Sequence, residues 1–283
     1  MTTAGAAAAV ACARLAAAGV AAPRLDARLL VAHVLGVAPQ TVFTRPETPL
    51  SAAQAATLDS LVTRRAAREP VSRIVNRRGF WTLDLALGPD TLDPRPDSET
   101  LVEALLAALP GRDRRLRVVD FGTGSGCLLL ALLTERPAAW GLGVDRSPGA
   151  LAVALANAAA CGLAGRTAFV CADWGRGLDG CFDAILANPP YIPSDEIAGL
   201  EPEVAVFDPR LALAGGPDGL DCYRVLVPHV ARLLTSGGAA ALEVGAGQAE
   251  AVGQMAQDAG LTVAEIRRDL GGVPRCVVAI RPA

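Results

Sequence analysis

Apolar side chains recur at helical spacing along the first 75 or so residues, and no strand pattern interrupts them. The clearest run consists of Leu25, Leu29, Leu30, His33 and Val34. A stop is expected at Gly36, because glycine is common just beyond a helix end. Ser51 and Gln54 have the spacing of a capping box and predict a helix that ends near Pro70. We therefore expect a small helical bundle at the start of the chain.

The hydrophobic period changes between Gly79 and Leu92. Leu83, Leu85 and Leu87 alternate with smaller or polar residues, which favours a strand or hairpin joining two domains. Residues 94–99, with the sequence PRPDSE, then offer rigid turns and a helix N-cap. The predicted domains are a helical domain over residues 1–78, a hairpin linker over 79–95 and a second domain over 96–283.

From Gly111 onward, apolar runs of strand length alternate with helical stretches. The predicted strands are 116–121, 140–144, 167–171, 182–187, 238–244, 262–266 and 276–280. The predicted helices are 125–133, 148–160 and 248–260. This alternation predicts an α/β fold with a mostly parallel sheet that helices cover on both faces. Such sheets bind ligands beyond the carboxyl ends of their strands, which is where we expect the functional residues.

A glycine-rich turn follows the first of these strands and consists of Gly122, Thr123, Gly124, Ser125 and Gly126. Its glycines permit a tight turn and close approach of a ligand to the backbone. The order G-x-G-x-G differs from the dinucleotide pattern G-x-G-x-x-G, so a pyrophosphate cradle is not expected. Asp145 ends the second strand, where a carboxylate can accept hydrogen bonds from both hydroxyls of a ribose, although it could also be a helix cap. Together these features favour an adenosine cofactor.

Asp173 and Trp174 follow the third strand. Asp173 could accept a hydrogen bond from the amino group of an adenine, and Trp174 could lie against the ring. The alternative is a tryptophan of the core whose indole N–H is bonded within the protein.

The residues Asn188, Pro189, Pro190 and Tyr191, named here the NPPY segment, follow the strand predicted at 182–187. Two prolines could simply end the strand. Because proline has no N–H, however, such a loop presents mainly carbonyl acceptors. The side-chain oxygen of Asn188 and a neighbouring backbone carbonyl could both accept from one NH2 group, and Tyr191 could stack on a flat substrate.

Two such acceptors address a specific chemical problem. An amide or exocyclic amine nitrogen is a poor nucleophile because its lone pair is delocalised. Fixing both N–H directions favours a pyramidal nitrogen whose lone pair points at an electrophilic methyl group, so that positioning and electrostatics supply most of the rate. No dedicated general base is required, because the methylated nitrogen becomes strongly acidic. The NPPY segment therefore indicates methylation of a planar NH2 nitrogen.

With these motifs the sequence resembles the HemK/PrmC family, methyltransferases that modify the glutamine of the Gly-Gly-Gln motif in bacterial peptide chain release factors. The resemblance extends over nearly the whole chain. Besides the motifs above, it includes residues 68–70, 80–81, 94–100, 120–126, 208–213, 215–220, 223–224 and 243–245.

The resemblance implies a class I methyltransferase fold, with a seven-stranded, mostly parallel sheet and a small N-terminal helical bundle that helps to hold the release factor. It also implies S-adenosylmethionine as cofactor, S-adenosylhomocysteine as product, and the amide nitrogen N5 of glutamine as the methylated atom. The implied cofactor contacts are Gly122, Thr123, Gly124, Ser125, Gly126, Asp145, Asp173, Trp174 and Asn188. The NPPY segment is implied to hold the glutamine, with Asn188, Pro189 and Tyr191 as catalytic residues. Bacterial class I release factors in the cytoplasm are the expected partners.

Two positions depart from the family pattern. Asp93 stands where an apolar residue is usual, and residues 271–275 replace a more polar turn, which puts local packing in doubt more than activity. Two alternatives stay open. The same tetrapeptide serves methyltransferases that act on amino groups of adenine, cytosine or guanine, and a binding module could keep the fold without catalysis. The intact NPPY segment disfavours the binding module.

Composition and charge narrow these alternatives. The 283 residues carry a formal net charge of −3, whereas a nucleic-acid-binding protein typically has a basic face, so no direct nucleic-acid substrate is expected. The longest uncharged run, residues 147–165, contains Pro148 and Asn157 and does not predict a membrane span. The basic stretch from Arg64 to Arg78 is either a solvated helix face or a docking surface for an acidic partner.

The seven cysteines are odd in number and form no C-x-x-C pair, so we expect reduced, buried thiols. With only His33 and His229, the chain offers few candidates for a zinc site or a histidine-based triad, and no metal is predicted.

Overall fold

The computed structural model describes residues 2–283, which fold into two compact units. The helical unit comprises the chain up to Arg77 together with Glu201–Phe207. The α/β unit comprises Arg78–Leu200 and Asp208–Ala283. A short segment from far along the sequence therefore folds with the N-terminal helices.

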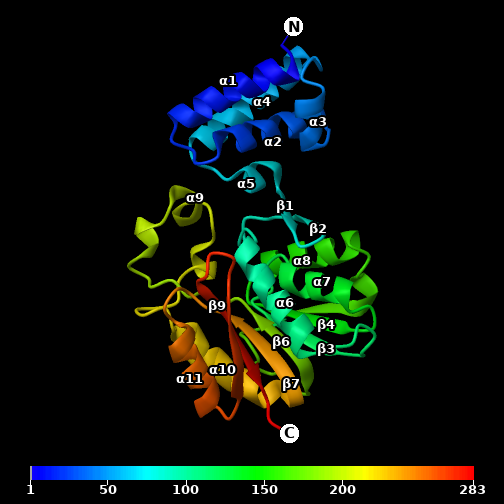
Figure 1. Ribbon diagram of the computed structural model, residues 1–283, viewed down its shortest axis with the longest axis vertical. Helices are drawn as coiled ribbons and strands as arrows, with labels where there is room; N and C mark the ends of the chain where they lie inside the picture. The colour runs from blue at the N-terminus through cyan, green and yellow to red at the C-terminus, as the bar shows by residue number, and fades with distance from the viewer. Residues whose placement is uncertain (1) are drawn as a thin grey trace. The chain divides into compact units, whose positions relative to one another are not determined.

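The N-terminal helices of this unit lie together (Figure 1), and their apolar faces form one core that includes Leu15, Leu30, Val31 and Val62. The helices that form this core are α1 (Ala4–Ala17), α2 (Pro23–Leu35), α3 (Pro39–Thr44), α4 (Ala52–Ala66) and α5 (Val71–Val75). Helix α9 (Pro202–Ala205) belongs to the same unit. The predicted helical bundle is confirmed.

The ends of these helices follow local rules. Gly36 adopts a left-handed φ of 66° beyond the end of α2, a conformation that glycine allows without strain. Ser51 and Gln54 form the predicted capping box at the start of α4. Helix α4 ends at Ala66, earlier than predicted, and the chain then turns through Arg68, whose φ is 72°.

A two-stranded sheet follows, formed by β1 (Arg77–Phe80) and β2 (Leu83–Ala86). Trp81 at its turn donates its backbone N–H to Glu99 at 2.7 Å and its indole N–H to Glu135 at 3.0 Å. These two bonds fasten the turn to the helices of the α/β unit.

A seven-stranded sheet forms the centre of the α/β unit, with the order β5-β4-β3-β6-β7-β9-β8. Its strands are β3 (Arg117–Phe121), β4 (Trp140–Asp145), β5 (Thr167–Cys171), β6 (Phe182–Ala187), β7 (Leu234–Glu243), β8 (Thr262–Arg268) and β9 (Pro274–Ile280). Strands β3 to β7 pair in parallel, and β9 runs antiparallel to both β7 and β8. The predicted mostly parallel, seven-stranded sheet is confirmed.

Helices cover both faces of this sheet because successive strand residues point to opposite sides. On one face Val118, Leu186 and Val278 pack with α6 (Glu99–Ala108) and α7 (Cys127–Glu135). On the other face Val119 and Ile185 pack with α10 (Asp221–Leu233) and α11 (Ala249–Asp258). Helix α8 (Pro148–Ala160) and the 3₁₀ turns η1 (Pro96–Ser98), η2 (Ala164–Arg166), η3 (Ile197–Gly199) and η4 (Arg210–Ala212) complete the unit.

Helix α10 is absent from the elements predicted above, although its buried side chains do recur at helical spacing. They are Tyr223, Leu226, Val227, Val230 and Leu233. Pro228 lies inside the helix, and proline inside a helical pattern normally signals a break. Pro228 therefore prevents the sequence pattern from predicting this helix, which is stabilised by its packing against the sheet.

Two further expectations concern the cysteines and the membrane. All seven cysteines are free thiols, but only Cys276 is buried. Cys171 and Cys181 are exposed and the other four are partly exposed, so the expectation of buried cysteines is wrong for most of them. Over residues 2–283, no helix combines the length and the apolar character needed to cross a bilayer.

Candidate active site

The site lies where the strand order of the sheet reverses. Strand β3 pairs with β4 on one side and with β6 on the other, which makes its carboxyl end the switch point of the sheet. Because these strands are parallel, the loops after Phe121, Asp145 and Ala187 emerge at one edge.

A pocket opens at this edge and brings nine of the predicted site residues together. They are Gly122, Thr123, Gly124, Ser125, Asp145, Asp173, Trp174, Asn188 and Pro190. Gly126, Pro189 and Tyr191 are not among its lining residues. Residues outside the predicted set, such as Arg95, Ser98 and Leu211, line it as well.

Two hydrogen bonds to neighbouring carboxyl groups hold the glycine-rich turn in place. The hydroxyl of Thr123 donates to the carboxyl of buried Asp120 at 2.7 Å, and the N–H of Gly124 donates to Asp145 at 2.9 Å. Burial raises the pKa of Asp120 to about 7, although the Thr123 hydrogen bond opposes this rise. The turn is therefore fixed before any ligand binds.

The Asp145 carboxylate retains acceptor capacity. One oxygen accepts the N–H of Gly124, and the other accepts the N–H of Ser147, each at 2.9 Å. A carboxylate oxygen has two lone-pair directions, so each oxygen can accept a further hydrogen bond from the pocket. The local contacts of Asp145 therefore leave room for a pair of ribose hydroxyls.

Gly122 lies where three parts of the site meet, and its left-handed backbone conformation favours glycine. Its φ is 71°, and a Cβ at this position would lie 3.7 Å from the Trp174 ring and 3.8 Å from the backbone oxygen of Asn188. Trp174 itself adopts a φ of 51°, an uncommon left-handed conformation for a bulky residue. Its half-buried ring both packs against the core and lines the pocket.

Asn188 has a defined side-chain orientation. Its Nδ2 donates to the hydroxyl of Ser98 at 3.2 Å, which leaves Oδ1 as an acceptor. Ser98 belongs to the PRPDSE sequence, for which a helix N-cap is predicted above. Ser98 does occupy the N-cap position of α6, as predicted, but its side chain makes no capping bond because the residue already has helical dihedral angles. The Ser98 hydroxyl therefore orients Asn188 rather than capping α6.

Tyr191 does not line the pocket, and hydrogen bonds fix both its backbone carbonyl and its side-chain hydroxyl. Its carbonyl accepts a hydrogen bond from Gln248 at 2.9 Å, and its hydroxyl donates to Glu243 at 3.2 Å. A Cβ at Gly219 would lie 2.3 Å from the Tyr191 carbonyl oxygen, so the loop over residues 215–220 can only approach this closely as glycine.

Three residues that contribute to the site are not among the predicted site residues. Ser98 and Glu243 lie within the motifs of the family resemblance, where no single role marks them. Asn157, 2% exposed on α8, accepts the N–H of Ala86 and donates to the carbonyls of Ala86 and Ser125. A lone asparagine in an alanine-rich helix is the signal that could have revealed it.

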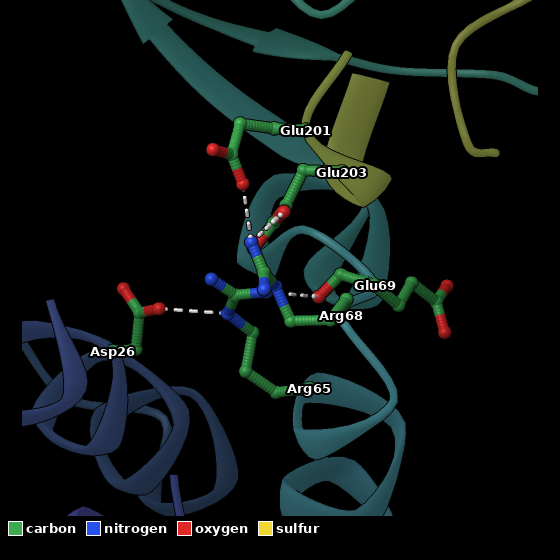
Figure 2. Close-up of polar contacts among 6 residues, drawn as sticks. All are labelled: Asp26, Arg65, Arg68, Glu69, Glu201 and Glu203. Carbon is green, nitrogen blue, oxygen red and sulfur yellow. Dashed lines mark hydrogen bonds and ion pairs between the residues drawn. The ribbon is translucent and has the colours of Figure 1, made fainter. Parts of the chain in front are cut away.

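The basic stretch from Arg64 to Arg78 is largely paired within the chain, and Figure 2 shows the partners of Arg65 and Arg68. Arg65, only 6% exposed, binds Asp26 at 2.7 Å and Glu203 at 2.9 Å. Arg68 binds Glu203 at 2.6 Å and Glu201 at 2.8 Å, all within the helical unit. Neither a solvated face nor a docking surface describes Arg65, and charge reversal there would disturb folding rather than association alone.

The two departures from the family pattern find partners in the α/β unit. Asp93 is 3% exposed, and its carboxylate pairs with Arg78 at 3.4 Å. In the 271–275 turn, Arg275 pairs with Asp269 at 3.1 Å. Local ion pairs therefore accommodate both sequence changes.

The comparisons with known proteins agree with this architecture. Residues 6–75 match the PrmC N-terminal domain, and residues 93–199 match the methyltransferase small domain. A solved methyltransferase from Pyrococcus furiosus shares the fold, with a TM-score of 0.54 at 15% identity over 80% of this chain and 98% of that one. The α/β unit is therefore a methyltransferase domain.

Whole-chain similarity narrows this class to one family. The chain is 54% identical over 270 residues to the release factor glutamine methyltransferase of Rhodospirillum rubrum, covering 95% of this chain and 82% of that protein. It is 46% identical over 269 residues to the protein of the same name from Caulobacter vibrioides, covering 95% of this chain and 93% of that protein. The chain belongs to the family of release factor glutamine methyltransferases.

Proposed function

We propose that this protein transfers a methyl group from S-adenosylmethionine to N5 of the glutamine in the Gly-Gly-Gln motif of bacterial class I release factors. The observation that carries the proposal is the NPPY segment at the carboxyl end of β6, where Asn188 and Pro190 line the pocket. The family to which the chain belongs supports the same activity.

The donor set of the pocket fits S-adenosylmethionine. Asp145 has acceptor capacity for the ribose hydroxyls, and the glycine-rich turn permits close approach of a ligand to its backbone. Asp173 and Trp174 also line the pocket, where Asp173 can accept a hydrogen bond from the adenine amino group and Trp174 can pack against the ring. When bound, the cofactor supplies the electrophilic methyl group. Release of S-adenosylhomocysteine completes the turnover.

The NPPY segment holds the glutamine amide. Asn188 Oδ1 and a neighbouring backbone carbonyl accept its two N–H groups, because Asn188 Nδ2 is already committed to Ser98. Pro189 and Pro190 carry no N–H, so they add no donor that would compete for these acceptors. The residues orient the nitrogen lone pair, and the proton lost after transfer passes to water.

Substitution of Asn188 tests this role. Asn188→Ala should lower kcat by about 10²–10³, the usual cost of removing a preorganised polar group from a reacting site. Asn188→Asp, which keeps an acceptor oxygen but lacks the donor to Ser98, should retain more activity than Asn188→Ala. Circular dichroism checks that both variants fold. Near-normal turnover by folded Asn188→Ala would contradict the proposal.

We further propose that the helical unit contacts the release factor outside the Gly-Gly-Gln motif. Phe43 on α3 is 81% exposed, and exposed aromatic side chains are common anchors of protein interfaces. Deletion of residues 1–75 is a poor test, because it would also remove the arginine partners of Glu201 and Glu203. A point substitution tests the contact without removing these ion pairs.

Phe43→Ser should raise KM for an intact release factor and leave kcat/KM for a short Gly-Gly-Gln peptide unchanged. Leu270→Ser, at a fully exposed leucine of the α/β unit, is the matched control and should change neither value. Equal kinetics of Phe43→Ser and wild type on the intact factor would exclude Phe43 from the contact.

A further inference from the structure

Glu243 is a buried carboxyl at the carboxyl end of β7, in a part of the site to which the chemistry above gives no role. It is 2% exposed, and its Oε1 accepts the Tyr191 hydroxyl at 3.2 Å. Its other carboxyl oxygen, Oε2, has no hydrogen-bond partner among residues 2–283. Burying a carboxylate oxygen without a hydrogen-bond partner lowers the stability of the fold, so its presence here calls for a functional explanation.

The surroundings of Glu243 connect it with the other end of the NPPY segment. The Ser98 hydroxyl acts on the Glu243 carboxyl and favours its charged form. The same hydroxyl accepts the Asn188 amide at 3.2 Å. Because a hydroxyl has one donor and two acceptor directions, Ser98 can accept from Asn188 and donate to Glu243 at the same time.

We propose that Glu243 is a positioning residue for methyl transfer. Its buried carboxyl orients Tyr191 directly and orients Asn188 through Ser98. The first and last residues of the NPPY segment are then held by one group on a different strand. This inference rests on the proposed transfer to an amide nitrogen, for which the direction of the Asn188 oxygen matters most.

The backbone around Glu243 is fixed by bonds that do not involve its carboxyl. Its own backbone carbonyl accepts the Tyr223 hydroxyl at 2.7 Å. Next along the chain, Gly245 donates its N–H to Gln248 at 3.0 Å, and Gln248 donates to the Tyr191 carbonyl. Tyr191 is therefore bonded at its carbonyl and at its hydroxyl by groups from one short stretch, and its ring cannot turn without breaking one of these bonds.

Charge on Glu243 decides how many donors it can accept. A carboxylate has only acceptor oxygens, so Oε1 accepts from Tyr191 and Oε2 attracts the nearby Ser98 hydroxyl, whereas a protonated carboxyl must itself donate and can no longer attract both hydroxyls. Burial raises the pKa of Glu243 to about 7, and burial together with the Glu243 charge keeps the pKa of Tyr191 well above its usual range. The other titratable groups that act on Glu243 are Asp97 of η1, Cys127 of α7, Tyr223 of α10, and Arg275 and Cys276 of β9.

The test uses the full-length enzyme, labelled S-adenosylmethionine and an intact release factor. Glu243→Gln should lower kcat by at least about tenfold, as expected for a lost hydrogen bond to a charged group, and leave the cofactor Kd within about twofold. In the wild type, log kcat should rise with pH to a plateau near neutrality, and this rise should be absent in Glu243→Gln. Ser98→Ala should lower kcat too, and its combination with Glu243→Gln should cost less than the two single losses together.

Tyr223→Phe is the matched control, because it removes a buried hydroxyl bonded to the Glu243 backbone and leaves the carboxyl in place. It should keep kcat even if it lowers stability. An equal loss of kcat in Tyr223→Phe, or a Glu243→Gln enzyme with wild-type kcat and pH profile, would overturn the positioning role while the proposed function stands. A wild-type enzyme that methylates no release factor would instead refute the proposed function and this inference with it.

Discussion

Substitution of Asn157 would test how the cofactor side of the pocket is supported. On α8 its Oδ1 accepts the Ala86 N–H at 2.8 Å, and its Nδ2 donates to the carbonyls of Ala86 and Ser125 at 3.0 and 2.9 Å. One side chain thus ties the β1–β2 hairpin and the glycine-rich turn to the same helix. Asn157→Ala would leave one N–H and two carbonyls without these bonds.

The structure sets the expected size of this effect. Leaving a buried polar group unsatisfied costs about 1–3 kcal/mol. Ser125 is buried, but Ala86 is only partly buried, so water can replace some of its lost bonds. We therefore expect Asn157→Ala to lower the free energy of unfolding by about 2–4 kcal/mol. Asn157→Asp keeps the acceptor for the Ala86 N–H but places a second carboxylate oxygen against two carbonyls, so it should lose at least as much.

Urea unfolding measures the stability change, and calorimetry measures cofactor affinity. Because the Ser125 carbonyl is released, S-adenosylmethionine should bind about tenfold more weakly to folded Asn157→Ala, which corresponds to about 1.4 kcal/mol. Gln257→Ala, at an exposed amide on α11, is the control and should change neither value. An Asn157→Ala protein that unfolds at the wild-type urea concentration would refute the reasoning.

Three further predictions concern single groups. Asp145→Ala should weaken cofactor binding by calorimetry far more than it lowers kcat at saturating cofactor, and an unchanged Kd would place the ribose elsewhere. Arg65→Ala should lower the free energy of unfolding by about 2–4 kcal/mol in urea, since it removes the arginine partner of Asp26 and leaves Glu203 with Arg68 alone, whereas Arg65→Lys should lose less. Burial raises the pKa of Asp120 and Glu243 to about 7, above their unfolded values, so their stabilising contribution is complete below about pH 4 and is lost as pH rises through 7. Thermal melts of Glu243→Gln should therefore show a smaller loss of stability over this range, and an unchanged loss would contradict the assignment.

Much of the fold can be predicted from sequence because it depends on local patterns. The strands of the sheet are short apolar runs between turn residues, and the capping box at Ser51 and Gln54 acts within four residues. The turns after β3, β4 and β6 can be placed together because parallel strands end at one edge. The pocket brings together predicted residues from all three of these turns.

The features that sequence reasoning missed depend on contacts between distant segments. Pro228 conceals α10, which tertiary packing maintains against its local preference. Ser98 stands at the N-cap of α6, but its hydroxyl bonds to Asn188, 90 positions away, and makes no capping bond. Arg65 and Glu203 are 138 positions apart, so no local pattern in the basic stretch could show that they pair.

The most direct measurement of the proposed activity is mass spectrometry of a purified bacterial release factor after incubation with this enzyme and S-adenosylmethionine. We predict the mass gain of one methyl group, located by fragmentation on the side-chain nitrogen of the glutamine in the Gly-Gly-Gln peptide. The Asn188→Ala enzyme should leave the peptide unmodified over the same time. An unmodified glutamine with the wild-type enzyme, or transfer of the methyl group to a nucleic acid offered in competition, would contradict the proposed function.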